Sequence, residues 1–289
     1  MRLGVDLGGT KIEAATLEGD RVTARERVPT PRDDYGAIIQ TIADLADRLA
    51  PPGLPLGIGI PGSLSPATGL VRNANSTALN GKPFDRDLSA ALSRPVRLAN
   101  DANCFALAEA RMGAGQGVET VFGVILGTGV GGGVVVHGKL LTGRNAIAGE
   151  WGHTPLADSA PAPRCWCGRY GCVEAWCSGP ALAADHLRVT GADMTAEMIA
   201  AVAQAGDLDA RETLERHVNR LGRAMAPVVN ILDPDIIVLG GGLSNMAHLY
   251  DELPSAMRPH IFSDCVETQI VRHRLGDSAG VIGAAWLWP

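Results

Sequence analysis

One histidine and three cysteines between residues 149 and 174 have the types and the spacing of metal ligands. His153 comes first, and Cys165, Cys167 and Cys172 follow in a Cys-x-Cys-x4-Cys pattern. Three thiolates and one imidazole complete a tetrahedral zinc site and leave no position for water, which is typical of a structural zinc. The spacing differs from the Cys-x-x-Cys of thioredoxin-like redox motifs. We therefore predict a structural Zn²⁺ held by these four residues.

Two carboxylates, Glu150 and Glu174, bracket the predicted metal ligands. Because a closed zinc site has no open position for a reactant, the metal is expected to fix a loop rather than to perform chemistry. The acids at the ends of that loop would then be held in place for another partner. Trp151 and Trp166 are expected to cover the loop as local core.

Two glycine-rich stretches of the chain resemble each other. Residues 3–19 read LGVDLGGTKIEAATLEG and residues 122–138 read FGVILGTGVGGGVVVHG. Each pattern indicates an apolar strand, a glycine turn and a second apolar strand, which is a β-hairpin with nearly bare backbone at its tip. Chance likeness between two hairpins is the alternative. An internal duplication is favoured because each hairpin begins a half of the chain that also holds later strands and helices.

Glycine turns after strands allow backbone N–H groups to approach phosphates closely. The Gly-x-Gly-x-x-Gly at 127–132 matches the dinucleotide fingerprint, but that motif should open a helix, and the apolar run that follows here is typical of a strand. The sequence contains no Walker A motif. With a third glycine turn at 240–242, the pattern predicts a nucleotide held between two lobes, with tight turns that bind nothing as the alternative. The predicted nucleotide and Mg²⁺ contacts are Asp6 (to Mg²⁺ through water), Thr10 and Lys11 (to phosphate oxygens), and the turn residues Gly8, Gly9, Thr128, Gly129, Gly131, Gly132, Gly241 and Gly242.

Strands alternate with helices in both halves of the chain, which predicts an α/β fold of two lobes with a cleft between them. A glycine-rich link at 113–117 sets the expected lobes at 1–115 and 116–289, with the last helix packed back on the first lobe. The charged residues of the helix expected at 211–232 are predicted to face solvent. Helices are expected at 36–49, 102–111, 211–232 and 280–288, and buried strands at 56–60, 96–99 and 235–239.

The composition is that of a soluble globular protein of 289 residues, 46% hydrophobic and 19% charged. A net charge of −6 argues against nucleic acid as a partner, because phosphate backbones require a basic face. The longest apolar runs fall short of the roughly 20 residues that span a membrane. The glycine-rich start does not resemble a signal peptide, so we expect a cytoplasmic protein with reduced thiols.

Six short motifs follow one another along the sequence. They are DLGGTK at 6–11, LANDAN at 98–103, ILGTGVGGG at 125–133, GEWGH at 149–153, CWCGRYGCVE at 165–174 and LGGGLS at 239–244. Together with GDSAGVIGAAWLWP at the end of the sequence, they resemble the ROK family of sugar kinases and sugar-sensing repressors, and the resemblance covers the whole chain. It implies a two-lobed actin-like or ribonuclease H-like ATPase fold with a duplicated domain, ATP-dependent phosphorylation of a hexose, and a homodimer.

Within the family, NANSTALNGKPFDRDL, GEWGHTPL and the AAWLWP ending are similar to bacterial fructokinases. GTGVGGG and TGRNAIAGE are similar to N-acetylglucosamine kinases. Fructose is therefore the expected substrate, with N-acetylglucosamine, glucose and mannose as alternatives. A sugar-responsive repressor is disfavoured, because the first strand begins at Arg2 and leaves no room for a helix-turn-helix segment before it.

The resemblance implies that Asp101 is the general base that accepts the proton of the sugar hydroxyl. Asp101 is expected at the start of a helix, where the helix dipole favours the ionised carboxylate, and a plain helix cap is the alternative. For His153, one ring nitrogen would bind zinc and the other would donate to the sugar. The sugar contacts that the resemblance implies are Asn75, Asn100, Asp101, Glu150, His153 and Glu174.

Overall fold

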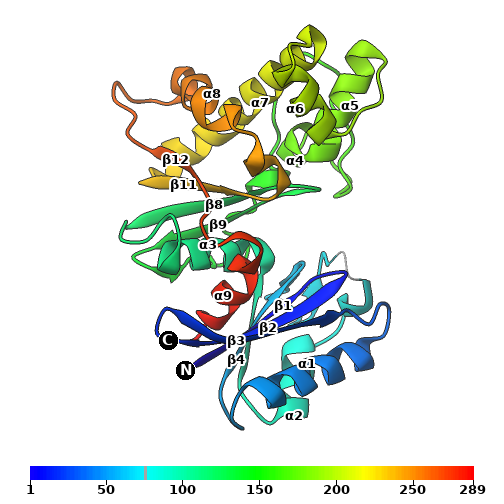
Figure 1. Ribbon diagram of the computed structural model, residues 1–289, viewed down its shortest axis with the longest axis vertical. Coiled ribbons are helices and arrows are strands. Elements are labelled where there is room, and N and C mark those ends of the chain that lie inside the picture. Colours follow the sequence, from blue (N-terminus) through cyan, green and yellow to red (C-terminus); the bar gives the residue numbers. More distant parts are fainter. Residues whose placement is uncertain (75–76) are drawn as a thin grey trace. The chain divides into compact units, whose positions relative to one another are not determined.

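The computed structural model describes residues 1–74 and 77–289 (Figure 1). Its contacts divide the chain into two compact α/β units. Unit 1 comprises Met1–Gln116, Gly138–Ala148 and Leu275–Pro289, and unit 2 comprises Gly117–His137 and Gly149–Arg274. Two segments from the second half of the sequence, including the C-terminus, thus belong to unit 1.

Unit 1 is built on a five-stranded sheet in the order β3-β2-β1-β4-β7, in which β1 pairs antiparallel with β2 and parallel with β4. Its elements are β1 (Arg2–Leu7), β2 (Lys11–Glu18), β3 (Arg21–Pro29), α1 (Tyr35–Leu49), β4 (Leu56–Ile60), β5 (Ser63–Leu64), β6 (Val71–Arg72), α2 (Phe84–Leu92), β7 (Val96–Asn100), α3 (Asp101–Met112), β10 (Lys139–Leu140) and α9 (Ala279–Ala285).

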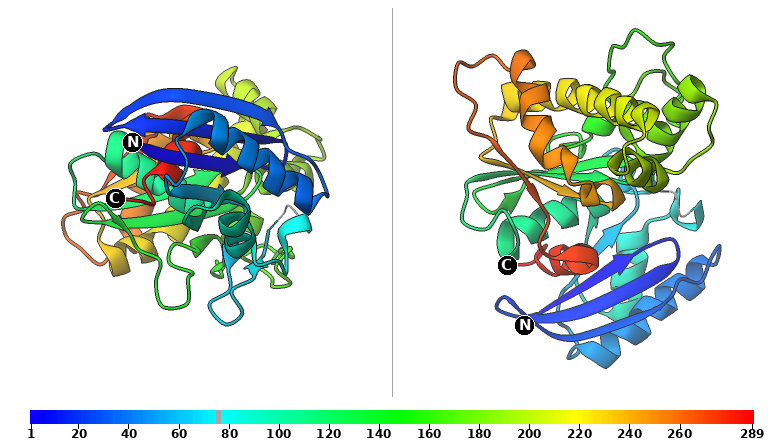
Figure 2. Two further views of the ribbon diagram at one scale, coloured as in Figure 1. Left: turned by 90° about the horizontal axis from the view of Figure 1, so that it is seen from below. Right: turned by 45° about the horizontal axis from the view of Figure 1, so that its top comes forward.

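The two faces of this sheet are covered by different helices because successive side chains of a strand point to opposite faces. Leu56, Ile58 and Ile60 of β4 pack with the apolar stripe of α1 in one buried cluster. Of the two intervening glycines, Gly57 faces α9 and Gly59 faces Cys104 of α3, and Figure 2 shows α9 and α1 on opposite sides of the strands. The alternation in LGIGI therefore assigns one face to side-chain packing against α1 and the other to close contact with α9 and α3.

Unit 2 contains β8 (Thr120–Leu126), β9 (Val130–Val136), β11 (Ile236–Gly240) and β12 (Gln269–Arg272), which follow the order β9-β8-β11-β12. One face of these strands forms a buried core with the helices of the unit. The helices are α4 (Val173–Cys177), α5 (Gly179–Thr190), α6 (Ala196–Gln204), α7 (Leu208–Leu232) and α8 (His248–Met257).

The predicted duplication is confirmed by the strand orders. In unit 1, β2 and β1 form an antiparallel hairpin, and β1, β4 and β7 run parallel. In unit 2, β9 and β8 form the equivalent hairpin, and β8, β11 and β12 run parallel. The two matching glycine-rich stretches thus occupy the same place in two similar sheets.

Most predicted elements agree with the structure within three residues, and the two largest shifts are at the start of α7 and at the end of the C-terminal helix. That helix ends at Ala285 rather than at Trp288. Beyond it, the Trp288 indole donates to the Leu56 carbonyl, and Arg97 donates to the Leu287 carbonyl, so these last residues are held by the sheet of unit 1.

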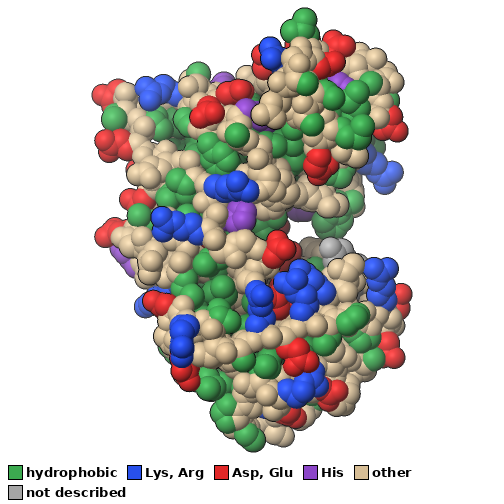
Figure 3. Space-filling model, in the orientation of Figure 1, with side chains coloured by type: hydrophobic (Ala, Val, Ile, Leu, Met, Phe, Trp, Pro, Cys, Tyr) green, Lys and Arg blue, Asp and Glu red, His purple; other side chains and the backbone are tan. Residues whose placement is uncertain are grey.

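None of the helices within residues 1–74 and 77–289 has both the length and the apolar character that crossing a membrane requires. Acidic and basic side chains are interspersed on the face drawn in Figure 3. This agrees with a sequence of 25 basic and 31 acidic residues.

Replacing Gly57 by alanine tests the backbone contact between β4 and α9. An added Cβ would lie 1.8 Å from the Ala284 carbonyl oxygen, so the helix would have to move. We expect Gly57→Ala to lower the free energy of unfolding by about 2 kcal/mol or more, as overpacking does, measured by chemical denaturation. Gly36→Ala in α1 is the control, because its Cβ would meet nothing closer than 3.6 Å and should leave stability unchanged or higher.

Candidate active site

The tip of the first hairpin presents open backbone. Gly8 N donates to the Lys11 carbonyl at 3.0 Å, and Thr30 Oγ1 donates to the Gly8 carbonyl, which closes the turn. Gly9 and Thr10 are exposed, and no atom lies within 4 Å of a Cβ built on Gly9. The turn therefore has the room that a phosphate group needs to reach backbone N–H groups.

Asp6 lies at the end of β1 beside this turn, in an electrostatically unfavourable position. Burial and the carboxylates of Asp101 and Glu13 raise the pKa of Asp6 to about 6, against the opposing effect of Lys11 and Arg27. The carboxylate also lies against Gly280 of α9, where an added Cβ would be 2.6 Å from Oδ2. A divalent cation would relieve the repulsion among these acids, so the donor chemistry fits the predicted Mg²⁺.

Asn100 and Asp101 form the start of α3. Asn100 is the N-cap, and its Oδ1 accepts from Ala102 N at 2.9 Å, while Asp101 Oδ1 accepts from the same N–H at 2.8 Å. Asp101 is exposed in the first turn of the helix. Asn100 is thus the N-cap residue, and the side chains of both Asn100 and Asp101 accept from the first free N–H of the helix.

The four predicted metal ligands come together in unit 2. One ligand atom from each of His153, Cys165, Cys167 and Cys172 lies within 4.8 Å of all the others. Cys165 Sγ is 3.6 Å from His153 Nδ1, and Cys167 Sγ is 3.6 Å from Cys172 Sγ. Two ligands of one tetrahedral zinc lie roughly 3.5–3.8 Å apart, so the cluster fits Zn²⁺ in both donor type and size.

Glu174, in the first turn of α4, connects the cluster to the second hairpin. Its Oε2 accepts from Val130 N at 3.0 Å, and its Oε1 accepts from the Trp166 indole. The carboxylate lies so close to Gly129 that an added Cβ would be 2.7 Å from Oε2. The sequence did not indicate this contact, which joins residues 44 positions apart and explains the glycine at position 129.

The two tryptophans near the cluster differ. Trp151 is 5% exposed and donates from Nε1 to the Gly131 carbonyl, so it belongs to the core beneath β9, as predicted. Trp166 is 67% exposed, although its ring packs edge-on against His153. The expectation of local core is therefore wrong for Trp166. Glu150 lies beside Trp151 and is exposed.

The third glycine turn packs against the second hairpin. Gly241 has φ of 80°, and an added Cβ would lie 2.3 Å from the Leu126 carbonyl oxygen, so only glycine fits there. Next to Gly242, unit 2 contains a pocket of about 830 Å³ between α6, the first turns of α7, and the start of α8. Its wall includes apolar Ala203 and Leu214 and polar residues such as Asn245.

Each unit holds part of the predicted site. Unit 1 contains the residues of the first glycine hairpin, Asn100 and Asp101, and Asn75 lies outside the described residues. Unit 2 contains Glu150, Glu174, the metal ligands, Thr128–Gly132 and the Gly241–Gly242 turn.

The charged face predicted for the helix at 211–232 is only partly solvated. Arg220 is 4% exposed, and Thr213 and His217 are buried on the same side of α7. The prediction is wrong for Arg220, because its partners Asp158 and Asp185 lie on segments distant in the sequence. Polar residues at 213, 217 and 220 recur at the helical spacing of the apolar stripe, and this pattern could have indicated that they are buried.

A model described as the ROK family matches residues 2–289. The chain belongs to the ROK family. It is 40% identical to an N-acetyl-D-glucosamine kinase of Escherichia coli O6:H1, over 99% of each sequence. It also resembles the crystal structures of a ROK hexokinase from Thermus thermophilus (TM-score 0.88, 35% identity, 98% and 96% of the two chains covered) and of a ROK glucokinase from Streptomyces griseus in complex with glucose and AMPPNP (0.78, 29%, 99% and 98%).

These comparisons confirm the predicted ROK sugar kinase family and its two-lobed α/β fold, and they support the use of ATP. The narrower expectation of a fructokinase is not supported by the relatives. The homodimer, the cytoplasmic location and bound Mg²⁺ stay predictions for this ROK kinase.

Metal analysis tests the ligand cluster directly. We expect the purified ROK kinase to contain about one zinc per chain. Cys172→Ser should lose most of this zinc, because it removes a buried thiolate of the set. Cys265→Ser should retain the zinc, because Cys265 is exposed and lies outside the cluster. A wild-type protein that carries no zinc, or equal zinc in both variants, would contradict the assignment.

Proposed function

We propose that this ROK kinase transfers the γ-phosphoryl group of ATP to a hydroxyl of N-acetylglucosamine or a closely related hexose. The observation that carries the choice of sugar is the 40% identity over 99% of an N-acetyl-D-glucosamine kinase. N-acetylglucosamine, first considered as an alternative, thus replaces fructose as the first candidate. ATP and the sugar are converted to ADP, the sugar phosphate and one proton.

Asp101 is the proposed general base. Its carboxylate is exposed at the positive end of α3, where it would meet a substrate hydroxyl. A carboxylate is a weak base, but phosphoryl transfer passes through a loose transition state in which the hydroxyl loses its proton late. Holding and orienting the hydroxyl is therefore as important as basicity.

The nucleotide is proposed to bind by its phosphates at the glycine turns. Bound Mg²⁺ would neutralise charge on the β- and γ-phosphates, and Asp6 is the residue proposed to hold it. Thr10 and Lys11, at the tip and at the start of β2, would donate to phosphate oxygens. Thr128 and Gly129 would offer the equivalent backbone from the second hairpin.

The pocket beside Gly242 is the proposed nucleoside site. Its volume of about 830 Å³ lies within the range of small-molecule sites, which combine apolar walls with a few polar groups. His248, which lines the pocket, has an Nε2 that is buried without a hydrogen-bond partner among the described residues. A purine ring or a water molecule would supply that partner.

The sugar is proposed to bind through Glu150, His153 and Glu174 of unit 2. With Nδ1 directed to the metal ligands, Nε2 of His153 remains for a sugar hydroxyl. Glu174 Oε1 accepts from the Trp166 indole and from Cys165 Sγ, whereas Oε2 accepts only from Val130 N and has a second lone pair for a sugar hydroxyl. The bonds to Val130 and Trp166 therefore fix the carboxylate without exhausting its capacity.

Steady-state kinetics with four sugars tests the proposed substrate. We expect kcat/KM with ATP and Mg²⁺ to be at least about tenfold higher for N-acetylglucosamine than for fructose, because a site that pairs with a polar group rejects analogues lacking it. Glucose and mannose should lie between these extremes. A higher kcat/KM for fructose would return the assignment to fructokinase, and the absence of turnover with all four would overturn the proposal.

Replacing Asp101 by asparagine tests the base. Asp101→Asn should lower kcat by about 10²–10⁴-fold, because it removes proton acceptance, while the calorimetric affinity for the sugar changes little. Asp20→Asn, an exposed residue in the turn between β2 and β3, is the matched control and should behave as wild type. A kcat within about threefold of wild type would remove Asp101 from this role.

A further inference from the structure

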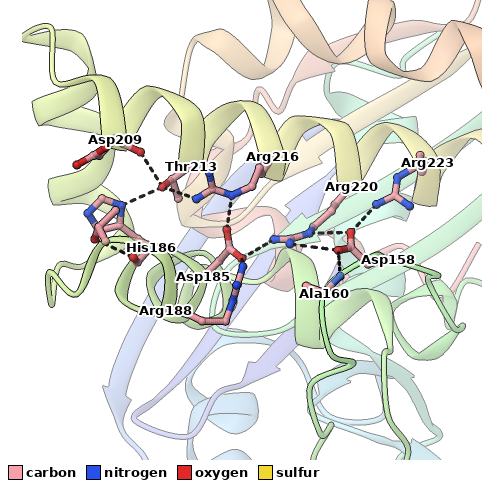
Figure 4. Close-up of polar contacts among 11 residues, drawn as sticks. Asp158, Ala160, Asp185, His186, Arg188, Asp209, Thr213, Arg216, Arg220 and Arg223 are labelled. Atoms are coloured by element: carbon pink, nitrogen blue, oxygen red, sulfur yellow. Dashed lines mark hydrogen bonds and ion pairs between the residues drawn. The ribbon is translucent and has the colours of Figure 1, made fainter.

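A buried arginine on α7 connects three segments of unit 2. Arg220 donates from Nε to Asp158 Oδ2 at 3.1 Å and forms an ion pair from NH1 to Asp185 Oδ1 at 3.0 Å (Figure 4). Its guanidinium also lies 4.5 Å from the ring centroid of Trp176. Asp158 lies in the loop between His153 and Cys165, Asp185 lies on α5, and Trp176 lies on α4.

Both acids of this cluster are ionised at neutral pH. Burial opposes ionisation of Asp158, but hydrogen bonds from Arg220, Ala160 N and Arg223 lower its pKa to about 2. Burial likewise opposes ionisation of Asp185, and its arginine partners nevertheless lower its pKa. Figure 4 shows Arg188 and Arg216 at Asp185, and Arg223 at Asp158. Each carboxylate is paired with arginines, so the cluster has a defined geometry and no unpaired negative charge on these two acids.

Asp158 anchors the metal loop near its middle. The loop begins at His153, returns at Cys165, and is also held at Leu156, whose N–H donates to the Gly171 carbonyl. Arg223 adds a bond to the Ala157 carbonyl. The segment between the first two metal ligands is therefore attached to α7 at Ala157 and Asp158.

Through Trp176, the guanidinium of Arg220 also contacts α4, the helix that carries Glu174. Cys172 is the N-cap of α4, and Glu174 and Trp176 are two residues apart on it. His217, one turn before Arg220 on α7, also lies 2.9 Å from the Cys177 carbonyl through Nε2. Arg220 thus contacts both chain segments whose separation determines where the metal ligands and Glu174 lie.

Stability alone is a poor explanation for such a cluster, because well-packed apolar residues often replace buried ion pairs without loss of stability. A planar guanidinium differs in fixing the directions of two carboxylates at once. We infer that Arg220 is a positioning residue for sugar binding, which holds the metal loop and α4 in register so that His153 and Glu174 face the sugar. The inference rests on the proposed function.

Three variants separate positioning from general stability. Arg220→Met removes the guanidinium group. Asp158→Asn removes only the charge of its partner on the loop and leaves Asp185 paired with Arg188, Arg216 and Arg220. Arg188→Met is the matched control, because Arg188 binds Asp185 from a half-exposed position and has no bond to the loop. If Arg220→Met does not fold, Asp158→Asn carries the test.

We expect the variants to change the KM for the sugar and not the KM for ATP. Asp158→Asn and Arg220→Met should raise the KM for the sugar by about tenfold or more and leave the KM for ATP within about twofold, with the double variant no worse than Arg220→Met. Release of zinc to excess EDTA should also be about tenfold faster in both. Arg188→Met should match wild type in every measurement.

The outcomes that overturn the inference are distinct from failure of the proposed function. Folded Asp158→Asn with unchanged sugar KM and unchanged zinc release overturns it, as does an equal rise in the KM for sugar and ATP. If wild type phosphorylates none of the sugars or binds no zinc, trypsin cleavage after the exposed Arg164 provides the readout. Cleavage should be faster in Asp158→Asn than in Arg188→Met, and equal rates overturn the inference.

Discussion

Close approach of backbone to its neighbours is the constraint on which the placement of the site depends. In unit 1, α9 lies against β4 because Gly57 leaves room for the Ala284 carbonyl, and Gly280 leaves room for the Asp6 carboxylate. In unit 2, the third glycine turn fits against the Leu126 carbonyl because Gly241 has no side chain. A single Cβ at any of these places would displace backbone or carboxylate, and with it the groups proposed to meet the nucleotide and its metal.

The proposed sugar site of unit 2 depends on side-chain contacts instead. The four predicted metal ligands bring the two ends of one loop together. Glu174 joins that loop to the second hairpin, and Arg220 attaches it to α7. Each connection uses a side chain that reaches across the unit. Zinc would therefore shape the proposed sugar site, while the proposed phosphoryl transfer belongs to Asp101 and the glycine turns.

The buried acids of the two units have pKa values shifted in opposite directions. Asp158 and Asp185 are surrounded by arginines, and these partners lower the pKa of each despite burial. Asp6 has acids nearby, and burial together with Asp101 and Glu13 raises its pKa. The protein does not fully offset the buried negative charge of Asp6, and a bound cation would do so. This feature distinguishes a candidate cation site from a structural ion pair.

The sequence by itself determined what local spacing can encode. The apolar alternation of LGIGI gave β4 its bounds, the Cys-x-Cys-x4-Cys spacing identified ligands within one loop, and the repeated hairpins indicated the duplication. Only the tertiary structure decided the contact between Arg220 and Asp158, the partner of Glu174, and the exposure of Trp166. The physical reason is that a charged side chain is buried only where a partner from a distant segment meets it.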